Sequence, residues 1–123
     1  MNLPNVFQIL AADTSVTEIL GTSPTRCYLF GNAPQGEANP YVTWQIPVSV
    51  PENHLSKLPV VDNDRVQVDV YALDQQTVIT LAGRIRDAIE PHAHMITKIN
   101  MGKDPDTKLF RWVLEFTFWT PRT

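Results

Sequence analysis

The chain has 123 residues, of which 43% are hydrophobic and 19% charged, and its formal net charge is −3. These values predict one globular domain over residues 1–123 that buries a core of its own, and they exclude a disordered chain. Acidic and basic residues are interspersed, so no concentrated basic surface marks nucleic acid as a specific partner.

Cysteine usage and apolar runs bear on the compartment. The single cysteine, Cys27, excludes an internal disulfide and is interpreted as a small buried hydrophobe. The N-terminus lacks the basic start and apolar stretch of a signal peptide. No apolar run approaches the roughly 20 residues that span a bilayer. We therefore expect a soluble protein made in the cytosol, with no membrane partner.

The first apolar segment predicts two short helices or one broken helix. Residues 6–11 supply a broad apolar side, which residues 13–15 interrupt. Ser15 and Glu18 then have the spacing of a capping box, which predicts the start of a second short helix or of the second part of a broken one. Gly21 is the expected C-terminal stop.

Two strands are predicted in the next part of the chain. Residues 26–30 form a short aromatic candidate, and a turn region rich in Gly, Pro and Asn follows it. The second strand alternates between an apolar face of Val42, Trp44 and Ile46 and an opposite face of Tyr41, Thr43 and Gln45. Val48 and Val50 are expected to continue the apolar face. Pro47 lies on the opposite parity, which predicts an edge strand or a bulge.

Residues 51–64 contain two prolines among polar residues and predict a long loop or an extended hairpin arm. Both a functional segment and a passive surface connection remain open for them. A clean alternating strand follows over residues 66–72.

The most regular helical pattern follows Asp74, the expected N-cap. Apolar residues recur there at helical spacing: Val78, Leu81, Ala82, Ile85, Ala88 and Ile89. Pro91 is expected to end this helix.

Two further strands, at residues 95–101 and 108–119, flank a turn cluster and predict a hairpin. The last strand carries large apolar residues on one face: Phe110, Trp112, Leu114, Phe116 and Phe118. The order of elements predicts a two-layer α+β fold. In it a long amphipathic helix packs on a mostly antiparallel sheet, with short N-terminal helices.

No group of residues in the sequence predicts catalysis, a cofactor or a metal site. His92 and His94 are interpreted as part of a polar connection between helix and strand, because a metal site needs three or four ligands. Asp62, Asp64 and Asp69 lack the spacing of a calcium-binding loop, and Asp69 is interpreted as a solvated strand residue. Phosphate-binding glycine loops and nucleophile-elbow motifs are absent. The chain is therefore not expected to be an enzyme.

Apolar residues on the outward strand faces are the most suggestive feature. Leu109, Val113 and Trp119 lie opposite the core face of the last strand, and Tyr41 and Tyr71 lie outward on theirs. Exposed aromatic residues grouped on one surface often mark an interface. The alternative is that the N-terminal helices cover this second face of the sheet.

Several short motifs resemble the small tail-completion proteins of long-tailed bacteriophages, also called tail terminators or tail-to-head joining proteins. The motifs are Ala-Pro-Gln-Gly at residues 33–36, Pro-Tyr-Val at residues 40–42, the strand at residues 66–72 and the helix after it. The resemblance covers residues 16–119 and depends on the order and spacing of these motifs. It implies a ring subunit, typically of a homohexamer, that caps the finished tail tube, ends polymerisation and joins the tail to the head connector.

The resemblance also implies a structural virion protein at the head-proximal end of the tail, present in the host cytoplasm during assembly. Its implied partners are copies of itself, the tail tube protein and the head–tail connector protein, with no catalytic residues and no cofactor. A head-side neck protein and a small metal- or ligand-binding α+β domain remain as alternatives. The candidate interface residues are Tyr71, Arg111, Trp119, His54, Leu55 and Lys57.

Overall fold

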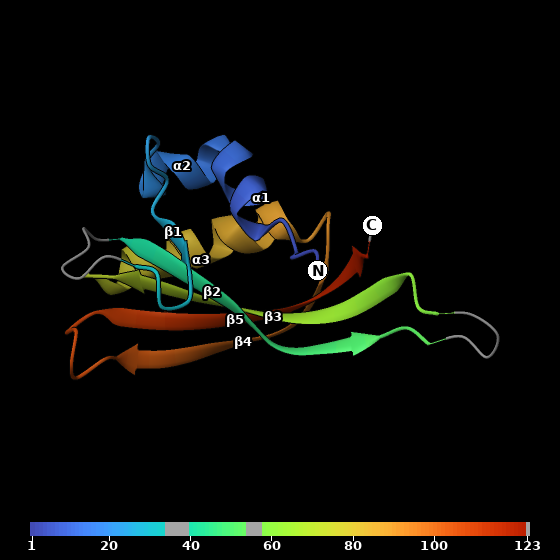
Figure 1. Cartoon of the computed structure of the whole chain (residues 1–123). Helices are drawn as coiled ribbons and strands as arrows, with labels where there is room; N and C mark the ends of the chain where they lie inside the picture. Colours follow the sequence, from blue (N-terminus) through green and yellow to red (C-terminus); the bar gives the residue numbers. More distant parts are fainter. Residues whose placement is uncertain (34–39, 54–57, 123) are drawn as a thin grey trace.

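The computed structural model in Figure 1 describes residues 1–33, 40–53 and 58–122. Its elements are α1 (Val6–Ala12), α2 (Thr14–Leu20), β1 (Cys27–Leu29), β2 (Tyr41–Pro51), β3 (Val61–Ala72), α3 (Gln75–Ile89), β4 (His94–Lys103) and β5 (Phe110–Pro121). The strands form one sheet in the order β1-β2-β3-β5-β4, in which only the β1–β2 pairing is parallel. The predicted α+β class and order of elements are confirmed.

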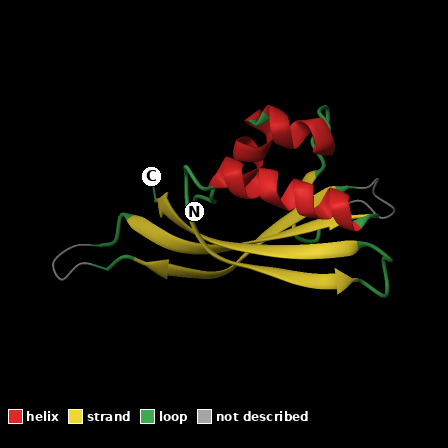
Figure 2. Cartoon of the chain, turned by 180° about the vertical axis from the view of Figure 1, so that it is seen from behind, coloured by secondary structure: helices red, strands yellow, loops and turns green. Residues whose placement is uncertain are grey.

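All helices of the described residues lie on one face of the sheet, as Figures 1 and 2 show from opposite sides. α3 packs across β3 and β5, and α1 and α2 pack on α3. The N-terminal helices therefore form an outer part of the same layer. The alternative in which they cover the second face of the sheet is wrong.

α3 follows its predicted pattern closely. The Asp74 carboxylate caps it by accepting a hydrogen bond from the Thr77 amide at 2.8 Å and another from the Thr77 hydroxyl at 2.7 Å. The side-chain bond from Thr77 is the main cause of a lowered pKa for Asp74. The buried residues of α3 are the predicted stripe: Val78, Leu81, Ala82, Ile85, Ala88 and Ile89. The helix ends before Pro91, as expected.

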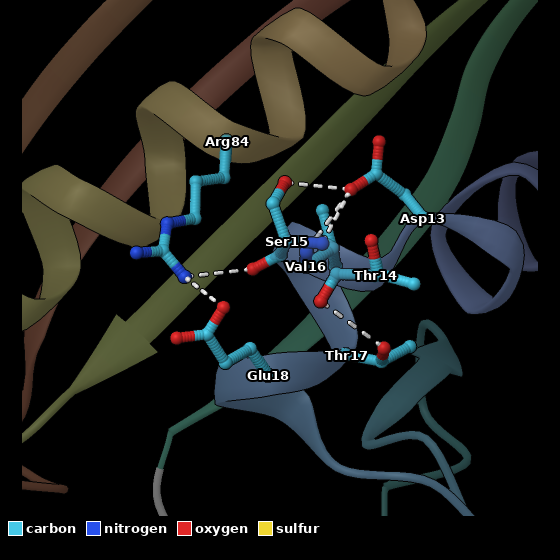
Figure 3. A network of polar contacts seen from close by, with 7 residues as sticks. All are labelled: Asp13, Thr14, Ser15, Val16, Thr17, Glu18 and Arg84. Carbon is cyan, nitrogen blue, oxygen red and sulfur yellow. Dashed lines mark hydrogen bonds and ion pairs between the residues drawn. The ribbon is translucent and has the colours of Figure 1, made fainter.

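The cap of α2 differs from the prediction, and Figure 3 shows the reason. Asp13 accepts hydrogen bonds from the Ser15 hydroxyl at 2.6 Å, the Ser15 amide at 2.9 Å and the Val16 amide at 3.1 Å. The hydroxyl bond is the largest cause of a lowered pKa for Asp13. The predicted capping box is wrong because Asp13 is the N-cap, while Glu18 lies 3.6 Å from Arg84 instead.

Arg84 connects α2 to α3. Its Nη1 atom donates a hydrogen bond to the Ser15 carbonyl oxygen at 2.8 Å, in addition to its contact with Glu18 (Figure 3). The Glu18 side chain is mostly exposed, so its ion pair adds less than about 1 kcal/mol to stability. The bond to the carbonyl oxygen links α2 directly to α3. α2 then ends at Leu20, and its C-cap Gly21 has a positive φ of 81°, which suits glycine.

β2 and β3 form an extended hairpin arm. β3 begins at Val61 rather than at the predicted Val66, and Pro51 pairs with Asp62. Figure 1 shows these paired ends extending past the helical layer. Pro51 and residues 61–64 therefore lie in paired strands, whereas residues 54–57 lie outside the described residues. A hairpin arm over the whole of residues 51–64 stays a prediction.

A bulge at Pro47 changes which face of β2 points toward the core. Beyond the bulge, Val48 pairs with Arg65 and Val50 pairs with Asn63. Directly paired residues point to the same side of a sheet, so both valines lie on the face away from the helices. Their exposures of 48% and 51% agree with this placement. The prediction that they continue the core face is wrong, whereas the predicted bulge is confirmed.

The core is centred on β5 and β3 beneath α3. On the predicted core face of β5, Leu114, Phe116 and Phe118 are buried, while Phe110 and Trp112 are partly buried against the same cluster. β4 pairs with β5 in the expected antiparallel hairpin.

Replacing Phe116 with Ala should lower the free energy of unfolding by about 3–5 kcal/mol, because this ring is fully buried and its loss leaves a cavity. Chemical denaturation followed by circular dichroism measures the change. Trp119→Ala is the control, since this exposed tryptophan should change stability by no more than about 0.5 kcal/mol. Equal losses in the two variants would contradict the assignment of the core.

Candidate functional site

The sheet face away from the helices, here called the open face, is the candidate site. The outward side chains of β3 and β5 define it, together with their partners on β2 and β4. The central residues are Arg65, Gln67, Asp69 and Tyr71 on β3, and Arg111, Val113, Glu115, Thr117 and Trp119 on β5. Within the part of the chain that the structure describes, no helix packs on this face.

An ion pair between the buried Asp69 and the partly buried Arg111 lies at the centre of the open face. Asp69 Oδ2 accepts hydrogen bonds from Arg111 Nη2 at 2.6 Å and Nε at 3.1 Å, and Gln67 donates to Oδ1 at 2.9 Å. The Asp69 side chain is only 3% exposed and that of Arg111 is 27% exposed. The prediction that Asp69 is solvated is wrong, because it lies within a cluster of larger side chains that includes Arg111 and Gln67.

Two tyrosines extend this cluster. The Tyr41 and Tyr71 rings stack with centroids 4.8 Å apart, and the Arg111 guanidinium lies 5.8 Å from the Tyr71 centroid. Desolvation, and then the negative charge of Asp69, raise the pKa of Tyr71 to about 12. Burial lowers the pKa of Arg111, but its hydrogen bond and charge interaction with Asp69 outweigh this effect, so the pKa is raised overall. Both groups therefore keep their ordinary charge states at neutral pH.

The structure brings together only two of the predicted interface residues. Tyr71 and Arg111 are direct partners across β3 and β5. Trp119 lies eight positions further along β5, roughly 27 Å away at the usual rise of a strand. The predicted residues His54, Leu55 and Lys57 lie outside the described residues. Whether any of these residues contacts a partner stays a prediction.

Trp119 belongs to a second group of exposed residues, which lies on the arm and on the part of β5 that pairs with it. It pairs with Asn63, whose other neighbour is Val50, and it is 57% exposed. We call Val48, Val50 and Trp119 the apolar strip. Sequence periodicity placed the two valines on the core face, because it does not include the bulge that turns them to the open face. Pro47 was the signal in the sequence for this bulge.

Two further apolar residues of the open face are not available to a partner. Leu109 and Val113, which were expected to be exposed if helices covered only one side, are each 5% exposed. Neighbouring side chains of the same sheet face cover Val113, which pairs with Asp69 and Ile99 on the two sides of β5. The accessible apolar surface is therefore smaller than the sequence predicted, and on β5 it is concentrated at Trp119.

The other candidate groups lie apart from one another. Asp62 accepts hydrogen bonds from Arg122, the nearer at 3.0 Å, and Asp64 is buried and accepts a hydrogen bond from Ser49. Asp69 lies on the opposite face of β3 from both, as the alternation of a strand requires. The three carboxylates therefore do not form a common site.

The histidines occupy a turn and the start of a strand. His92 lies in the turn after α3, and His94 begins β4. Among the described residues, no group of three or more His, Cys, Asp or Glu side chains is placed to bind a metal ion. Cys27 is buried as predicted, and desolvation raises the pKa of its thiol to about 12. No described helix is both long and apolar enough to cross a membrane.

A comparison with solved structures shows that the α+β fold is shared with a known protein. A chain from the virion of a native gene transfer agent particle superposes with a TM-score of 0.71 and 17% sequence identity. The match covers 94% of this chain and 91% of that chain. At this identity the likeness establishes the shared fold. A comparison with curated protein sequences found no match.

The sequence itself identifies the family. Residues 4–121 match the family described as tail completion protein gp17, and the chain therefore belongs to that family. Its members are structural virion proteins of phage tails, so the predicted resemblance is confirmed.

Replacing Arg111 with Ala should lower the free energy of unfolding by about 3 kcal/mol. This is the lower end of the range for breaking a buried pair, because Gln67 still donates to the buried Asp69 carboxylate. Urea denaturation measures the loss. The control is Arg65→Ala, which removes an exposed arginine from the same sheet face and should cost no more than about 0.5 kcal/mol. If Arg111→Ala lowers the free energy of unfolding as little as the control does, the ion pair contributes little to stability.

The raised pKa of Tyr71 predicts a stability that falls at alkaline pH. An unfolded tyrosine ionises near pH 10, whereas folded Tyr71 keeps its proton to about pH 12. The folded state then binds more protons than the unfolded state in this window. Its stability is therefore fully present below pH 10 and is lost as the pH rises toward about 12. The free energy of unfolding, measured by denaturation across this pH window, should fall less steeply with pH for Tyr71→Phe than for the unmodified chain. Equal slopes against pH would contradict the raised pKa of Tyr71.

Proposed function

We propose that the chain forms a closed homohexameric ring that caps the phage tail tube, ends its polymerisation and joins the tail to the head connector. The observation that carries the proposal is family membership over residues 4–121. A sheet face without a covering helix and an arm that exposes apolar side chains support it. The protein would lie in the virion, at the head-proximal end of the tail, and would be present in the host cytoplasm before assembly.

The physical requirements of a ring agree with these surfaces. A ring needs one surface of each subunit to fit a different surface of the next, with a rotation that closes. The apolar strip on the arm offers one such surface, and Trp119 is of the residue type enriched at interface centres. Arg111 and Tyr71 are proposed to contribute through their exposed portions, while their buried portions stabilise the subunit.

Replacing Trp119 with Ala should weaken ring assembly by about tenfold or more, because truncating an interface tryptophan removes a large buried area. Native mass spectrometry and negative-stain microscopy measure assembly, and circular dichroism checks that the subunit remains folded. Phe30→Ala is the matched control, since Phe30 is an exposed aromatic residue, 60% accessible, in the turn after β1. Equal assembly by both variants would remove Trp119 from the interface.

The function itself is tested in a phage that lacks this chain. Tails of aberrant length that fail to join heads are the expected result, and the unmodified chain should restore joining. Normal tails joined to heads would overturn the proposal. Antibody labelling of tails assembled without heads distinguishes a tail terminator from the alternative, a head-side neck protein. The antibody should label one end of these tails if the chain is a tail terminator, and only heads if it is a neck protein.

A further inference from the structure

A hollow of about 290 Å³ lies on the helical side of the sheet, between α3 and the edge strand β4. It exists because α3 packs on β3 and β5 and does not extend over β4. The residues that line it are chiefly apolar and cationic, and they include Ile79, Gly83, Met95, Trp112, Arg86 and Lys98. Its volume is at the lower end of the roughly 300–1,000 Å³ of small-molecule sites, which suits one or two side chains.

The charge of the hollow favours an acidic occupant. Arg86 lies 3.0 Å from Asp87 and 3.7 Å from Glu90, so its charge is partly compensated. Lys98 forms no ion pair with any residue that the structure describes, and no carboxylate lines the hollow there. An apolar side chain accompanied by a carboxylate is therefore the complementary ligand.

The described residues at the end of the β2–β3 arm, Glu52, Leu58 and Val60, have this chemistry. Leu58 is 85% exposed and Val60 is 63% exposed, so neither is packed within its own subunit. Glu52, which follows β2, forms no ion pair among the described residues. Pro59 lies between the two apolar residues and lacks an amide donor, which favours docking through side chains over strand pairing.

We propose that the arm end of one copy docks in the hollow of the next copy, with Leu58 and Val60 against its apolar lining and Glu52 facing Lys98. The contact joins two different surfaces of the same chain, so it repeats from copy to copy and can close a ring. This inference rests on the proposed ring and names the contact that would build it.

Engineered cysteines test the contact directly. The only native cysteine, Cys27, is 4% exposed and does not compete. Gly83→Cys places a thiol in the hollow without a clash, because a Cβ atom there meets nothing within 4 Å. In the double variant Leu58→Cys/Gly83→Cys, mild oxidation should produce a ladder of covalent oligomers that ends at the size of the ring. A mixture of the two single variants should stop at dimers joined between the two kinds of subunit.

Leu73 supplies the matched control. It is 65% exposed and lies between β3 and α3, away from the arm. Leu73→Cys/Gly83→Cys should give no ladder under the same conditions. Leu58→Ala should weaken ring association about tenfold or more, whereas Leu73→Ala should leave it unchanged. Gly83→Phe, which fills the hollow, should block assembly, and Gly83→Ala should not.

The outcomes separate this inference from the proposed function. Rings in native mass spectrometry without a specific ladder overturn the docking contact and leave the ring intact. A specific ladder without a stable ring supports the contact and overturns the ring. Monomers with no ladder overturn both. If Gly83→Phe forms normal rings that fail to cap tails, the hollow takes a different virion protein, and the inference is wrong.

Discussion

The packing of α3 across β3 and β5 is the contact on which the rest of the structure depends. It fully buries Leu81, Ile85 and Ile89 over β3 and β5, which pair with each other over their whole length. α1 and α2 then gain their own burial by packing on α3. Because one helix covers the centre of the sheet, two surfaces are left without a helix: the whole open face, and the part of β4 beyond α3.

The open face compensates for the missing helix with its own side chains. Asp69, Arg111 and the stacked tyrosines exclude water from the middle strands, so a cluster that looks like an exposed interface also stabilises the subunit. An ion pair exposed to water contributes little to stability. The Asp69 carboxylate is nearly inaccessible, so the loss of its partner would leave a buried charge uncompensated and lower the stability. The predicted interface residues therefore belong to two kinds. Tyr71 and Arg111 form part of the stable centre, whereas Trp119 is exposed on β5, beside the arm.

The sequence predicted best where a pattern continues without interruption. The apolar stripe of α3 and the alternation of β5 each persist over the whole element, so their buried faces follow from period alone. In β2 one bulge at Pro47 turns every later side chain to the opposite face of the sheet. The apolar periodicity of the sequence does not reveal such a shift. The burial of Asp69 was missed for another reason. Alternation reports the face of a residue and not the neighbours, here Arg111 and Gln67, that cover it.

The same bulge separates the side chains of β2 that stabilise the core from those that are exposed on the arm. Up to Trp44, β2 directs apolar side chains into the core, and beyond Pro47 it directs Val48 and Val50 outward on the arm. An exposed apolar arm would favour indiscriminate strand pairing, but prolines at both sides of its end remove amide donors. In the proposed ring, recognition through side chains would fix one geometry of contact. The proposed closed ring requires this, since pairing of bare strand edges would accept several registers and several angles.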